Sequence, residues 1–110
     1  MEIDSFIAEA GVSLEPAGVT NYAFTKSKAM EFLGLLRTKK VAVLGGDVYL
    51  PGNNCMRLTY DNWHTNKQSD EGDDSYIQRS IIVSMNFVEK YQDTSAHFAF
   101  TLRDMDIESQ

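Results

Sequence analysis

The sequence has only one cysteine, Cys55, so no disulfide bond can form within the chain. A chain without disulfides is typical of a reducing compartment, and we expect a cytoplasmic protein. No apolar run approaches the roughly 20 residues that a membrane-spanning helix needs. The first residues, MEIDSFIAEAG, carry acids in place of the basic segment of a secretion signal. These absences predict a protein that acts inside the cell, away from the membrane.

Histidine is also scarce: there are two, and neither stands at metal-site spacing from the other or from Cys55. The acids around Gly72 suggest a calcium loop, but Lys67 stands where an EF-hand requires an oxygen ligand. The chain contains neither a phosphate-binding glycine loop nor a nucleophile elbow. We therefore expect no metal, no cofactor and no enzymatic activity. One catalytic alternative is a small hydrolase that uses Asp47 and Asp61 as acid and base.

Basic residues number ten against sixteen acids, which gives a net charge of −6. Residues 1–40 hold five acids and five bases, whereas residues 41–74 hold six acids and two bases and therefore carry −4. Residues 75–110 hold five acids and three bases, which adds −2. Such a surface repels phosphate backbones, so direct nucleic-acid binding is not expected, and it attracts a protein with a basic surface. Because −6 is also an ordinary charge for a soluble protein, composition alone favours no partner.

Apolar residues recur at helical spacing in three segments, residues 3–10, 26–39 and 75–91. Thr25 is placed to cap the second helix, and Asp73 or Asp74 to cap the third. Residues 11–18 contain two glycines and a proline, and predict a loop.

Two β-rich segments flank the turn sequence PGNN and predict a hairpin over residues 41–61. Gly45 and Gly46 in its first strand predict a bulge or the close approach of another backbone. A polar loop is expected over residues 62–74, a last strand in AHFAFTLR, and a frayed tail in DMDIESQ.

The order of these elements predicts an α+β fold in a single domain over residues 1–110. Its sheet is expected to be small and partly antiparallel, formed by the hairpin and the C-terminal strand. The two main helices are expected to pack on one face.

Carboxylates and large aromatics alternate near the ends of the hairpin strands. Tyr60 is in phase with Leu58 and is expected in the core, whereas Tyr49 is expected to be an interface anchor. Trp63 fits either role. The predicted partner-binding surface consists of Asp47, Tyr49, Asp61, Asn62, Trp63, His64, Asp70, Glu71, Asp73 and Asp74.

Two hairpin segments, VLGGDVYL and the following LTYDNW, together resemble the signature of the immunity protein 40 family of bacterial polymorphic toxin systems. The preceding YAFTKSKAMEFLGLL and the acid-rich segment before the last helix fit the same pattern. The resemblance covers residues 22–100. The turn PGNN, Cys55 and Met56 depart from it, which leaves the hairpin tip without an expected role.

The resemblance implies an α+β immunity protein made beside a toxin gene, as in contact-dependent inhibition. Such a protein binds its toxin, often a nuclease, in the cytoplasm of the producing cell and neutralises it without catalysis. Our hypothesis is that the acids supply a negative electrostatic potential that attracts a basic cleft of the toxin. Tyr49 and Trp63 would then supply apolar contacts that anchor the complex. The alternative is an adaptor for another cytosolic protein. Self-association is a separate possibility, because an exposed edge of the hairpin or of the C-terminal strand could pair two copies as a homodimer.

Overall fold

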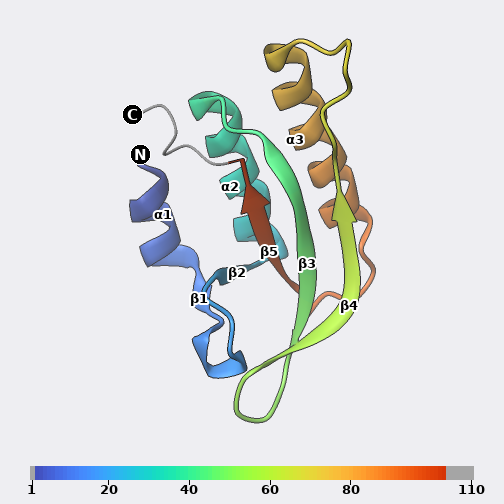
Figure 1. Cartoon of the computed structure of the whole chain (residues 1–110). Coiled ribbons are helices and arrows are strands. Elements are labelled where there is room, and N and C mark those ends of the chain that lie inside the picture. The colour runs from blue at the N-terminus through green and yellow to red at the C-terminus, as the bar shows by residue number, and fades with distance from the viewer. Residues whose placement is uncertain (1, 104–110) are drawn as a thin grey trace.

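A computed structural model describes residues 2–103 and confirms an α+β fold (Figure 1). Its helices are α1 (Ile3–Ala10), α2 (Lys26–Lys39) and α3 (Asp73–Lys90), with a short 3₁₀ helix, η1 (Glu15–Ala17). Its strands are β1 (Val12–Ser13), β2 (Tyr22–Thr25), β3 (Val43–Pro51), β4 (Met56–His64) and β5 (His97–Leu102). The tail DMDIESQ lies outside the described residues.

Helix α2 follows the sequence prediction because its cap and its apolar stripe are both local features. Thr25 Oγ1 accepts a hydrogen bond from the Lys28 N–H at 3.3 Å, and Lys40 ends the helix in the left-handed region, with φ of 60°. The predicted cap of α3 was wrong. The N-cap is Gly72, and Asp73 and Asp74 stand in the first turn, where their charges favour the helix dipole.

The five strands form one sheet in the order β1-β2-β5-β3-β4, and each neighbouring pair is antiparallel. The sequence missed β1 and β2, which are too short, at two and four residues, for an alternation to stand out. They extend the sheet past the C-terminal strand, so β5 lies between β2 and β3 and has no free edge. Residues 62–64, expected in a loop, continue β4.

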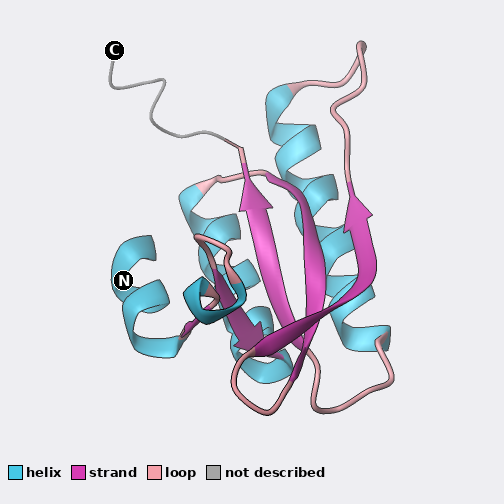
Figure 2. Cartoon of the chain, turned by 60° about the horizontal axis from the view of Figure 1, so that its bottom comes forward, coloured by secondary structure: helices cyan, strands magenta, loops and turns pink. Residues whose placement is uncertain are grey.

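Helices α2 and α3 lie behind the sheet in Figure 1, and the main core fills the space between them and the strands. Phe24, Phe98 and Phe100 point into this core from the sheet, as the alternation in the last strand predicted. On the opposite side, Leu14, Ala23, Tyr49 and Ala99 form a smaller apolar cluster. Figure 2 shows η1 on that side. We call the rest of that side, over β5, β3 and β4, the open face; none of the described helices covers it.

A chain of buried hydrogen bonds joins α3 to the hairpin. The Trp63 indole N–H donates to Ser84 Oγ at 2.9 Å, and Ser84 Oγ donates to the Ser80 carbonyl at 2.8 Å. Ser80 Oγ in turn accepts the Val43 N–H at 3.0 Å. The Trp63 ring also stacks on Phe87, with 4.5 Å between ring centroids. Since each of these polar groups has a partner, the network stabilises the fold without an uncompensated burial cost.

Gly45 and Gly46 of β3 confirm both features that the sequence predicted for them, a bulge and the close approach of another backbone. The pairing of β3 with β5 shifts register between Val43 and Gly45, which is a bulge. A Cβ on Gly46 would lie 2.3 Å from the Trp63 ring and 2.4 Å from the Ala99 carbonyl oxygen. Trp63 can therefore lie flat under the sheet only because residue 46 has no side chain.

Substituting Gly46 by alanine should lower the free energy of unfolding by about 1–3 kcal/mol, because the new methyl overlaps the Trp63 ring. Gly34→Ala is the matched control. Gly34 lies inside α2, and among the described atoms none comes within 4 Å of a Cβ built there. That change should raise stability by about 0.5–1 kcal/mol through helix propensity. Urea unfolding monitored by circular dichroism measures both; equal effects of the two changes would contradict the packing role of Gly46.

Candidate partner-binding surface

Three of the predicted surface residues meet on the open face. Asp47 on β3 pairs with Asn62 on β4, and Gly45 pairs with His64. Residues that pair across an antiparallel ladder share a face, so the side chains of Asp47, Asn62 and His64 lie together. They belong to a hollow of about 280 Å³ lined by Leu44, Gly45, Gly46, Asp47, Asn62, Trp63, His64 and Thr101.

Thr101 is one of four lining residues that the sequence prediction omitted, with Leu44, Gly45 and Gly46. It lies on β5 opposite Gly45 and is exposed. The alternation in AHFAFTLR placed Thr101 opposite to the core-facing phenylalanines. That pattern identified its face but could not identify β3 as its neighbour.

The two predicted aromatic anchors are buried. Tyr49 is 5% exposed and belongs to the smaller apolar cluster, so its predicted role as an exposed anchor was wrong. Burial raises the pKa of the Tyr49 hydroxyl, and the nearby Asp47 carboxylate raises it further. Trp63, for which the sequence allowed either role, is 7% exposed and belongs to the main core.

Tyr60 shows the opposite error: it was expected in the core and is 80% exposed. Between the pairs Asp47–Asn62 and Tyr49–Leu58, β3 advances by two residues and β4 by four. This bulge breaks the alternation on which the prediction depended, and Tyr60 adopts a φ of 73° within it.

Thr59 holds the bulge in place. Its hydroxyl donates to the Val48 carbonyl at 2.9 Å and accepts the Asp61 N–H at 3.0 Å. The backbone groups that lose their ladder partners thus gain side-chain partners. The tyrosine that follows Thr59 is pushed out toward solvent at the edge of the sheet.

Asp61 does not join Asp47. Its carboxylate accepts a hydrogen bond from the Tyr91 hydroxyl at 2.6 Å, next to the C-terminus of α3. This bond is the main reason that the pKa of Tyr91 is raised, and burial raises it further. Tyr91 packs against Phe98 on the helix-covered side of the sheet. The acid–base pair that a hydrolase would need is therefore divided between the two sides.

The acidic loop divides into paired and unpaired residues. Glu71 accepts two hydrogen bonds from the Arg79 guanidinium, at 2.7 and 2.8 Å, and one from the Gln68 N–H at 3.1 Å. Asp73 pairs with Arg103 at 3.2 Å. Asp70 and Asp74 are exposed, and no ion pair to either of them is found within residues 2–103.

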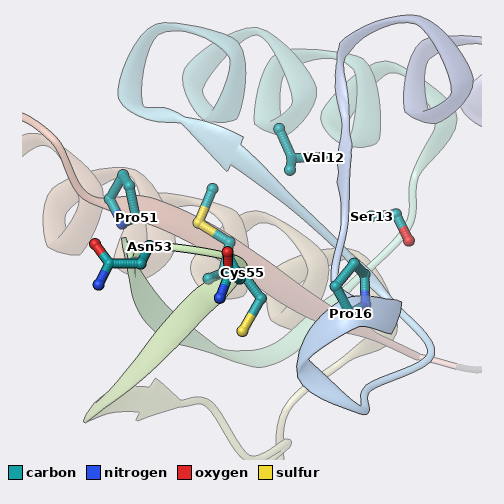
Figure 3. A pocket seen from close by; sticks show the side chains of 9 residues that line it. Val12, Ser13, Pro16, Pro51, Asn53 and Cys55 are labelled. Atoms are coloured by element: carbon teal, nitrogen blue, oxygen red, sulfur yellow. The ribbon is translucent and has the colours of Figure 1, made fainter.

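A second hollow of about 300 Å³ lies between the β1–η1 segment and the hairpin tip (Figure 3). Val12, Ser13 and Pro16 form one wall, and residues 51–56 form the other. The exposed Cys55 belongs to this second wall, and none of the predicted surface residues does. The lining of this second hollow contains no charged side chain.

In residues 2–103 no three His, Cys, Asp or Glu residues are grouped so that they would hold a metal ion. None of the helices described is long and apolar enough to cross a membrane.

The Arg79 guanidinium, through its hydrogen bonds, lowers the pKa of Glu71 from the ordinary 4.5 to about 2, with help from the Gln68 N–H. Because the folded-state pKa is the lower one, the stabilisation is complete above pH 4.5 and is lost as the pH falls toward 2.

Glu71→Gln should therefore destabilise the fold at pH 7, and the difference from the parent chain should shrink steadily below pH 4.5. Urea unfolding over a pH series measures this difference. Asp70→Asn removes the same charge from the same loop and should change stability little at any pH. A pH-independent deficit for Glu71→Gln would contradict the ion-pair explanation.

Comparison with known families adds one match. The family model described as Immunity protein 40 matches residues 13–102, which is most of the chain. The match confirms the resemblance seen in the two hairpin segments and extends it to include η1 and the end of β5. Neither a curated protein nor a solved structure matches the chain.

Proposed function

This chain belongs to the immunity protein 40 family, and we propose that it neutralises its toxin by docking the β4 side of the sheet against a basic surface. Membership in an immunity protein family implies toxin neutralisation and is typical of inhibitors that are not enzymes. It also favours toxin binding over the adaptor alternative. We further propose that the protein acts in the cytoplasm of the producing cell, on a toxin with a basic cleft such as a nuclease.

The excess of acids between Asp61 and Asp74, from the end of β4 to the start of α3, is the observation that carries this proposal. Asp61 is exposed on β4 itself, and Asp70 and Asp74 are exposed where the chain leaves β4 and enters α3. Acids arranged along one side attract a basic partner and speed its association. Glu71 and Asp73 contribute less to this field, because Arg79 and Arg103 neutralise them.

Tyr60 supplies an aromatic anchor for the toxin, which exposed charges alone cannot provide. Exposed ion pairs are weak and are screened by salt, whereas an aromatic side chain buried by a partner contributes most of its energy through desolvation. Tyr60 protrudes from the same strand as Asp61, and it replaces Tyr49 and Trp63 in this proposal.

β4 forms one edge of the sheet, and an exposed strand edge is where the sequence allowed a homodimer to form. An exposed edge can pair with a second copy, but the bulge at residues 59–61 interrupts the row of backbone groups that such pairing requires. A charged and bulged edge favours contact through side chains over extension of the sheet.

Family membership predicts a toxin domain encoded next to this chain, and the two proteins should co-purify. Replacing Asp70 and Asp74 together by lysine should slow association by roughly threefold to tenfold at low salt and flatten its salt dependence. Stopped-flow mixing over a salt series measures both effects. The control replaces Asp4 and Glu9 on α1, which are also exposed, with the same charge change. Equal effects of the two double variants, or rescue without any complex, would contradict the proposed surface.

Tyr60 and Trp63 provide a second test, in which one substitution should affect toxin binding and the other should affect stability. Tyr60→Ala should leave the free energy of unfolding nearly unchanged, because the side chain is 80% exposed, and should weaken toxin binding about tenfold. Trp63→Phe should cost about 2 kcal/mol of stability through lost packing and the lost bond to Ser84, with binding retained. Calorimetric titration and urea unfolding separate the two. Weak binding by Trp63→Phe with normal binding by Tyr60→Ala would overturn this assignment.

A further inference from the structure

The hollow on the open face is a fixed feature of the fold. It lies where β5, β3 and β4 run side by side, and both Gly45 and Gly46 belong to its lining. Gly45 shares the face of the hollow through its pairing with His64, and a Cβ on Gly45 would lie 2.3 Å from the Trp63 carbonyl oxygen. Because that position does not admit a side chain, the hollow stays open above Gly45.

Hydrogen-bond acceptors dominate the polar lining of this hollow. The half-buried Asp47 carboxylate has no ion pair within the described residues. The Asn62 side-chain N–H donates to the Tyr60 carbonyl at 3.1 Å, which leaves the amide oxygen of Asn62 as an acceptor. Thr101 adds an exposed hydroxyl from β5. The lining includes one carboxylate, one histidine, His64, and neither lysine nor arginine, so with histidine counted as neutral its formal charge is negative.

We infer that this hollow receives the guanidinium group of an arginine side chain on the toxin. A guanidinium offers five N–H donors in a plane, which matches a carboxylate flanked by further oxygen acceptors, whereas a lysine ammonium offers a point charge and only three donors. Leu44 at the rim is 36% exposed and can cover the methylene stem of the arginine. The inference rests on the proposed function, which makes the toxin the source of the arginine.

Two further hollows do not fit this ligand. The hollow at the hairpin tip has an uncharged lining. A third, on α3, is lined by Val83, Asn86, Phe87, Lys90 and Tyr91, and its one charged side chain is a cation. Of these three hollows, the one that contains Asp47 complements the charge of an arginine.

The first experiment uses N-acetyl-arginine amide as the probe and the free protein as the target. Its addition should shift the backbone amide resonances of Gly45, Gly46 and His64 in a saturable way. N-acetyl-citrulline amide, which has nearly the same shape without the charge, should not. Asp47→Asn should abolish the shifts and Asp70→Asn should keep them; shifts that survive Asp47→Asn, or that the citrulline probe reproduces, would overturn the inference.

The second experiment measures toxin binding, which separates this inference from the proposed function. Asp47→Asn should raise the dissociation constant about tenfold, mainly through faster dissociation, because it removes one partner of a partly buried charge pair. Its amide spectrum and free energy of unfolding, measured in parallel, establish that the variant is folded. If the parent chain binds the toxin and Asp47→Asn binds equally well, the arginine site is wrong and the proposed function stands. If the parent chain forms no complex, both are wrong.

Discussion

The packing of Trp63 between the sheet and α3 is the contact on which the rest of the structure depends. Its ring lies against Gly46 on one side and Phe87 on the other, and its N–H bonds Ser84. Neighbouring residues on a strand point to opposite faces, so the burial of Trp63 places Asn62 and His64 on the open face. The tryptophan therefore positions the proposed surface without belonging to it.

The serines of α3 make this arrangement rigid. Ser80 and Ser84 satisfy the Val43 N–H and the indole N–H at the point where a bulge removes regular ladder partners. Among the described residues, no buried side-chain nitrogen or oxygen lacks a hydrogen-bond partner. A surface supported in this way loses little conformational entropy when a partner binds, which favours affinity.

Acidic residues serve two different purposes in the same short segment. Glu71 and Asp73 bind Arg79 and Arg103, and so hold the loop and the start of α3 in place. Asp70 and Asp74 remain exposed. Net charge alone would count all four as available to a partner, whereas the structure leaves two that contribute fully to the proposed field.

Features that depend on residues close together in the chain were determined by the sequence itself. Thr25 caps α2, the turn PGNN closes the hairpin, and the phenylalanines of β5 alternate inward, because each of these follows from local geometry or from a period of two. The excess of acids in residues 41–74 and the family of the chain were also evident at that level.

Features that depend on register or on distant partners were decided by the tertiary structure. Tyr60 is exposed because β4 carries two more residues than β3 between successive pairs, and no pattern within β4 reveals that mismatch. Trp63 is buried because Gly46 on another strand leaves space for its ring. Asp47 and Thr101 lie on one face only because β3 and β5 are neighbours. Pairing between segments far apart in sequence is set by how the whole core closes, and a single strand's sequence does not encode it.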